Sequence, residues 1–169
     1  MEDDETARRP RTPASQGTNC PPTDSKRHLV CFVAGTPVWT EHGLVPIDSI
    51  DLGTCVLGWN EATGEIGYYP VYELIRSRHD DLCELELAGG ERIVCSRNHR
   101  FWVAGREWVR AENLGVGDPF LAGPSDAPMY VSSKTLFHAE EPVRVYNLEV
   151  EDVHTYFVGK EGVLVHNWK

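Results

Sequence analysis

Short β-type runs separated by turn signals are the feature that most limits what this chain can fold into. Glycine-containing turn sequences such as Glu41–Gly43, Glu61–Gly64 and Gly115–Asp118 recur at short intervals along the 169 residues. The expected strands are residues 36–40, 54–59, 67–74, 82–87, 92–95, 101–103, 129–137, 143–150, 156–158 and 163–165. Because no long amphipathic helix is visible and only residues 109–114 favour a helical turn, the pattern predicts an all-β domain.

Alternation within the runs predicts which faces are buried. From Cys83 to Leu87 every second residue is apolar, so these side chains share one face while the two glutamates between them face water. The longer segments 72–87 and 129–150 are expected to form two hairpin-rich arms, with the chain ends returning to one sheet.

Composition changes sharply at Leu29, and this change marks a domain boundary. Residues 1–30 are rich in Pro, Thr, Ser, Arg and Asp and contain almost no large apolar side chains. Such a segment cannot bury enough surface to offset the entropy of ordering, so it is predicted to be a disordered flank.

The net charge of −10 lies entirely outside that flank, whose five basic and five acidic residues cancel. A domain this acidic is a poor nucleic-acid partner, because phosphate contacts require clusters of Lys and Arg. No apolar run approaches the roughly 20 residues that cross a bilayer. The first residues also lack the basic and apolar regions of a secretory signal. Neither a nucleic acid nor a membrane is therefore expected as a partner.

The five cysteines predict free thiols. They lie at positions 20, 31, 55, 83 and 95, an odd number without C-x-x-C spacing, which disfavours a disulfide framework and a four-ligand zinc site. Cys55 and Cys83 alternate with core positions and are expected to be buried, and Cys95 is expected to pack under the turn that follows it. A free nucleophilic thiol also favours a reducing compartment such as the cytoplasm.

The C-terminal run Val163–Val165 should be a buried strand that delivers His166 and Asn167 to one fixed place. An asparagine side chain can attack its own backbone carbonyl, close a succinimide ring and cut the chain after itself. A neighbouring histidine can protonate the leaving amine and polarise the carbonyl. This stretch alone also fits a strand that simply ends in two polar residues.

Cys31 opens the predicted fold, and its thiol can reach back to the carbonyl of Val30. Attack there converts the amide into a thioester and frees the amine of Cys31. Ser96 and His99 follow a strand in a turn, three positions apart, and can converge on the same amide. The alternatives are a buried structural cysteine and an ordinary polar turn.

His154 leads the run 156–158, which should pair with the terminal strand through the turn Gly159–Gly162. Antiparallel pairing across that turn carries His154 towards His166 and Asn167. The alternative is a surface histidine at the start of a strand.

Taken in order along the chain, these features resemble the Hint (Hedgehog/intein) superfamily, and most closely the bacterial intein-like and pretoxin Hint domains of polymorphic toxins. In the motif Val94–His99, Ser96 stands where the family usually has Thr. The chain would then comprise an N-terminal flank of residues 1–30, an autoprocessing domain of residues 31–167, and residues 168–169 as the start of a C-terminal flank. The four motifs are Cys31–Val38 with Gly43–Ile47 behind it, Val94–His99, Val145–Val158 and Gly162–Asn167.

The resemblance implies a horseshoe-shaped Hint fold and gives each matched residue a role. Cys31 would be the nucleophile of an N-to-S acyl shift at the Val30–Cys31 bond, activated by Ser96 and His99. His154 and His166 would then assist the cyclisation of the C-terminal asparagine. The residues expected to carry the chemistry are Cys31, Ser96, His99, His154, His166 and Asn167. Neither a cofactor nor a metal is implied, and the substrates would be the flanking polypeptides of a monomer.

Two positions depart from the pattern of splicing inteins. Asn147 stands where they often have an aspartate, which bears on how the two cleavages are coordinated. Trp168 follows Asn167 where splicing normally requires Cys, Ser or Thr, and a tryptophan side chain cannot accept the acyl group from Cys31. The resemblance therefore implies cleavage at one or both ends, with release of a C-terminal effector such as a toxin.

Three other functions fit the same residues. The chain could splice its flanks through another route, or act in trans as a Cys/His hydrolase. It could also be a non-catalytic β-domain that serves as a spacer or binding module.

Overall fold

The structure is a computed structural model that describes residues 30–121, 123–124 and 129–167. The predicted disordered flank therefore lies outside the described residues, apart from Val30, and so do Trp168 and Lys169. In the described ranges the only helical segments are the short turns η2 (Ile47–Ser49) and η3 (Ala111–Asn113), the latter inside the predicted 109–114 turn. None of the helices described there has the length and apolarity to cross a membrane.

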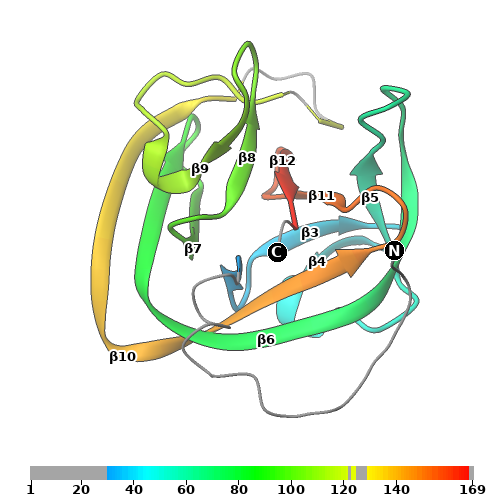
Figure 1. The fold of residues 1–169 in the computed structure, drawn as a ribbon, viewed down its shortest axis with the longest axis horizontal. Coiled ribbons are helices and arrows are strands. Elements are labelled where there is room, and N and C mark those ends of the chain that lie inside the picture. The colour runs from blue at the N-terminus through cyan, green and yellow to red at the C-terminus, as the bar shows by residue number, and fades with distance from the viewer. Residues whose placement is uncertain (1–29, 122, 125–128, 168–169) are drawn as a thin grey trace, which may run out of the picture.

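The rest of the described chain is almost entirely β-structure curved into a horseshoe, which confirms the predicted fold class (Figure 1). The described ranges hold nine shorter strands; six match expected runs to within one residue, and those at residues 32–33, 43–46 and 107–110 were not expected. The nine are β2 (Phe32–Val33), β3 (Pro37–Thr40), β4 (Gly43–Pro46), β5 (Cys55–Trp59), β7 (Arg92–Ser96), β8 (Arg100–Val103), β9 (Glu107–Arg110), β11 (Thr155–Val158) and β12 (Val163–His166).

Two long strands replace the expected hairpin-rich arms, so that expectation was wrong. Strands β6 (Ile66–Leu87) and β10 (Val131–Val150) are each continuous, and they pair antiparallel with one another along most of their length. Figure 1 shows them as the two curved ribbons that form the outer arc. The polar middle of β6 looked like a turn because both of its faces are largely exposed, and the expected turn in β10 is a bulge between His138 and Val143.

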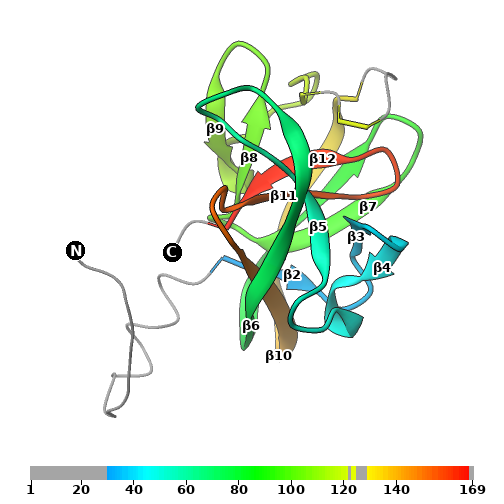
Figure 2. The ribbon, with the colours of Figure 1, turned by 90° about the vertical axis from the view of Figure 1, so that its right-hand side faces the viewer.

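The first and last described strands, β2 and β12, pair with different neighbours in the sheet. Strand β2 pairs with β7 and β10, and β12 pairs with β11 and β8. The start of β2 and the end of β12 leave the body on the same side, as Figure 2 shows. This topology brings the two ends of the domain together.

The cysteines differ from expectation at one position. Cys83 and Cys95 are buried in the core as predicted, but Cys55 opens β5 and is partly exposed, because it lies at the strand end beside Glu41. Each of the four cysteines in the described part of the chain is a free thiol.

Candidate functional site

The amide of Cys31 is held by Ser96. The Cys31 N–H donates a hydrogen bond to Ser96 Oγ (3.0 Å), and the Ser96 N–H donates to the Cys31 carbonyl (2.9 Å). Both residues are buried, and the pairing of Phe32 with Cys95 across β2 and β7 sets this register. The turn that the sequence singled out therefore places its serine on the nitrogen of the Val30–Cys31 bond.

His99 lies fully buried beside the same amide. Its ring packs against Phe32 with ring centroids 4.1 Å apart. Its backbone N–H donates a hydrogen bond to the Ser96 carbonyl, and its carbonyl accepts one from the Ala111 N–H. Neither ring nitrogen makes a hydrogen bond of acceptable geometry to any described residue. Burial, followed by the nearby His166, lowers the pKa of His99 to about 3, although the Cys31 backbone is close enough to oppose that fall. The imidazole is therefore neutral at pH 7.

The thiol of Cys31 is not ionised in this resting state. Burial raises its pKa to about 12, because a thiolate loses solvation in the core. Nucleophilic attack by Cys31 therefore requires a base that removes the proton during the reaction.

Asn167 is buried at the end of β12, and its side chain is held at the nitrogen. Nδ2 donates one hydrogen bond to the Leu148 carbonyl and one to Glu149 Oε1, each 2.8 Å long. Both partners are acceptors, so the amide can face them only with its NH₂ group. The atom that would attack in a cyclisation is thus oriented by β10.

The two predicted histidines flank Asn167. Thr155 pairs with His166, and the Asn167 N–H donates to the His154 carbonyl (3.0 Å), so the predicted pairing across the turn is confirmed. The His154 side chain is half exposed, and its Nδ1 lies 4.0 Å from Glu149 Oε1.

The ring of His166 is mostly buried and packs on Trp108 with centroids 4.9 Å apart. Burial, and then the nearby His154 and Arg100, lower the pKa of His166 to about 4. Like His99, this imidazole is neutral at pH 7.

Tyr156 joins the two halves of the site. Its hydroxyl donates to Asn147 Oδ1 (2.6 Å), which also accepts from the Leu148 N–H (2.8 Å). Burial raises the pKa of Tyr156 well above its usual value, and the nearby Cys31 thiol adds to the rise. Tyr156 thus lies between the thiol at one end of the domain and the β10 segment that holds Asn167.

One face of β10 carries contacts to both ends of the domain. Val145 packs with Cys31, Asn147 binds Tyr156, and two positions further on Glu149 binds Asn167. Glu149, Asn147 and Tyr156 were not among the predicted site residues. The period of two that places Val145 in the core also places Asn147 and Glu149 on its face, and this signal could have identified them.

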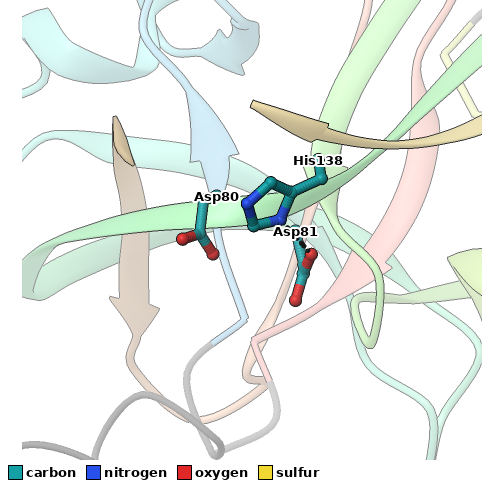
Figure 3. A group of neighbouring side chains, drawn as sticks. All are labelled: Asp80, Asp81 and His138. Carbon is teal, nitrogen blue, oxygen red and sulfur yellow. Dashed lines mark hydrogen bonds and ion pairs between the residues drawn. The ribbon is translucent and has the colours of Figure 1, made fainter. Parts of the chain in front are cut away.

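A separate acidic group lies on the outer arc. Ligand atoms of Asp80, Asp81 and His138 lie within 4.8 Å of one another where β6 and β10 bend (Figure 3). The His138–Asp81 hydrogen bond (2.9 Å) lowers the pKa of Asp81 and raises that of His138, and Arg97 lies 3.9 Å from the same carboxylate. These side chains have the chemistry to hold a cation, but none of them is a predicted site residue. A surface cavity of about 320 Å³ lies between this acidic group and the turn that carries Ser96. It is lined by Arg78, His79, Asp80, Asp81, Ser96, Arg97, Asn98 and Glu112.

The neutral buried histidines predict a loss of stability in mild acid. Both pKa values are depressed below 6.5, so below that pH the unfolded chain binds more protons than the folded one and the free energy of unfolding falls. Each histidine contributes up to about 1.4 kcal/mol per pH unit. We expect urea unfolding between pH 6.5 and 5, above the carboxyl range, to show this slope.

The variant His99→Phe should lose about half of that slope, because the contribution of His166 remains. Unfolding between pH 7 and 8 serves as the control, since both histidines are mostly neutral there in either state and the slope should be much smaller. An unchanged slope in the variant would contradict the assignment.

The chain matches a known protein family and known structures. The pretoxin HINT domain family model matches residues 37–168. No curated protein matches the chain significantly. The solution structure of a bacterial intein-like domain from Clostridium thermocellum is 39% identical, with a TM-score of 0.76 over 81% of this chain and 98% of that one.

Two inteins share the fold at lower identity. A DnaB intein from Synechocystis sp. PCC 6803 is 18% identical with a TM-score of 0.70, and covers 83% of this chain and 99% of its own. The gp41-1 intein is 21% identical with a TM-score of 0.65, and covers 82% of this chain and 98% of its own. The family match and the bacterial intein-like domain together show that this chain belongs to the pretoxin Hint domain family.

Proposed function

We propose that the chain is a single-turnover autoprotease that acts in cis on the peptide bonds at both ends of its domain. The observation that carries this proposal is that one face of β10 contacts both ends of the domain, with Val145 packed against Cys31 and Glu149 bound to Asn167. Ser96 binds the first scissile amide, and Leu148 and Glu149 hold the side-chain nitrogen of Asn167.

The first reaction is an N-to-S acyl shift at the Val30–Cys31 bond. Neutral His99 accepts the thiol proton while Cys31 Sγ attacks the Val30 carbonyl carbon. As the C–N bond breaks, the same proton passes to the Cys31 nitrogen, which Ser96 keeps oriented. The products are a thioester and a free amine, and water or an added thiol then releases the N-terminal flank. His99 begins this step neutral, so its ring has a nitrogen lone pair that can accept the proton.

The second reaction is the cyclisation of Asn167. Nδ2 bonds to the backbone carbonyl carbon of the same residue, the bond to Trp168 breaks, and a succinimide remains at the new end of the domain. Nδ2 loses one proton and the departing amine gains one. Burial keeps His166 neutral at pH 7, so its ring carries no extra proton at the start. His166 therefore first accepts a proton during the reaction and then gives it to the departing amine.

The residue after Asn167 favours release over ligation. Trp168 offers no hydroxyl or thiol to accept an acyl group, so the two flanks have no direct route to become joined. Release of whatever follows Asn167, such as a toxin effector, is the outcome that fits this chemistry. The complete burial of Cys31 also favours action in cis over turnover of an external substrate.

Intact-mass analysis tests the proposal. The chain is fused to one folded reporter at each end, purified, and incubated with and without added thiol. We expect the N-terminal reporter to be released by thiol and the C-terminal reporter to be released without it. A fusion that stays intact for days would overturn the proposal, and a ligated reporter–reporter product would show splicing instead.

Two residues at the first scissile bond should differ in their effect. We expect His99→Ala to slow thiol-dependent release by roughly 10²–10⁴-fold, because the proton transfer has no substitute. Ser96→Ala should slow it by only about tenfold, because one hydrogen bond is lost. The variants His42→Ala and Ser49→Ala, at exposed positions, are the matched controls. Equal rates for His99→Ala and Ser96→Ala would contradict these roles.

A further inference from the structure

Glu149 is a buried acid in the middle of the site with no role among the predicted residues. Only 5% of its side chain is exposed, near the end of β10, and its Oε1 lies 2.8 Å from Asn167 Nδ2. Burying a carboxylate costs free energy unless it is paired or hydrogen-bonded. Acids placed in this way against a reacting group are frequent at catalytic sites.

The chemistry of cyclisation requires a base at this atom. An amide nitrogen is a weak nucleophile, and it must give up a proton as its new bond to carbon forms. Two groups accept hydrogen bonds from Nδ2, the Leu148 carbonyl and the Glu149 carboxylate. Of the two, only the carboxylate can take the proton away.

We propose that Glu149 is the catalytic base of asparagine cyclisation. This inference rests on the proposed function. Oε1 takes a proton from Nδ2 of Asn167 as Nδ2 bonds to the backbone carbonyl carbon, and the bond to the next residue then breaks. The departing amine takes up one proton, so none is gained or lost overall once Glu149 is deprotonated again.

His154 has a defined place in this scheme. Its Nδ1 lies 4.0 Å from the oxygen that binds Asn167, and its carbonyl accepts the Asn167 N–H. A small approach of the ring lets His154 take the proton from Glu149 and return it to the active site. The half-exposed position of this histidine suits such a relay, because solvent can exchange its proton.

The variant Glu149→Gln separates a base from a positioning group. Glutamine has nearly the same shape and its carbonyl oxygen can still accept from Nδ2, but it cannot take a proton. In the full chain with a reporter fused after Lys169, we expect spontaneous C-terminal release to slow by about 100-fold or more. Glu149→Asp keeps the acid and should release faster than Glu149→Gln.

Release at the other end shows whether the variant is folded. Thiol-dependent cleavage before Cys31 should stay at the wild-type rate in Glu149→Gln, and Glu151→Gln, the same change in an exposed turn, should leave both reactions unchanged. If Glu149→Gln releases its C-terminal reporter as fast as the wild type, Glu149 is not the base. If the wild-type chain itself releases nothing, both this inference and the proposed function are wrong.

Discussion

The variant Asn167→Ala is expected to keep the C-terminal reporter attached in every molecule. An alanine has no side-chain nitrogen, so no succinimide can form. The wild-type chain should release the reporter and leave a domain one water lighter than the hydrolysed acid. Intact-mass spectra of both fusions over the same incubation measure the effect.

Structural damage would give a different pattern. Asn167→Ala removes the hydrogen bonds to Leu148 and Glu149 and leaves a buried carboxylate without this donor, which costs about 1–3 kcal/mol. Thiol-dependent release at the other end should persist if the fold survives. The control Asn60→Ala removes an asparagine from a surface turn and should cleave normally. Release at the wild-type rate from Asn167→Ala would show that cyclisation is not the reaction.

The fold was largely accessible from the sequence because its signals are local. Glycine-containing turns and alternating runs are set within a few residues, and they located six of the short strands and the helical turn at Ala111–Asn113 but not β2, β4 and β9. The long strands β6 and β10 were missed because their polar middles are stabilised by pairing with each other. That pairing joins residues far apart in the chain, and no local pattern reports it.

The candidate site also combines contacts that a local pattern predicts with contacts between distant strands. The backbone pairing of His154 with Asn167 follows from a hairpin and was expected from it. The hydrogen bond from Cys31 to Ser96 was also expected, but from the chemistry of the scissile amide, because it joins the distant strands β2 and β7. The contact of Glu149 with Asn167 joins β10 to the end of β12, so it depends on how distant strands pack. Protonation states were inaccessible for a related reason. The low pKa values of the buried histidines come first from burial, which only the folded structure defines.

The second large effect is expected at the other end of the domain, where Cys31→Ala should abolish thiol-dependent release of the N-terminal reporter. Alanine has no sulfur to accept the Val30 acyl group, so no thioester forms for an added thiol to attack. The measurement is the mass of the fusion with and without thiol. The control Cys83→Ala makes the same change at another buried cysteine, which does not touch the scissile amide, and should cleave like the wild type.

Cys31→Ala also tests whether the two reactions depend on one another. The methyl group of alanine preserves most of the packing against Val145, so Asn147, Tyr156 and the β10 segment that holds Asn167 should stay in place. Because the asparagine and its hydrogen-bond partners do not include the thiol, we expect C-terminal release to continue at near the wild-type rate. Loss of both reactions in Cys31→Ala, with Cys83→Ala unaffected, would mean that cyclisation waits for the thioester. The Tyr156–Asn147 hydrogen bond, which lies between the thiol and the asparagine, would then be the place to look for the coupling.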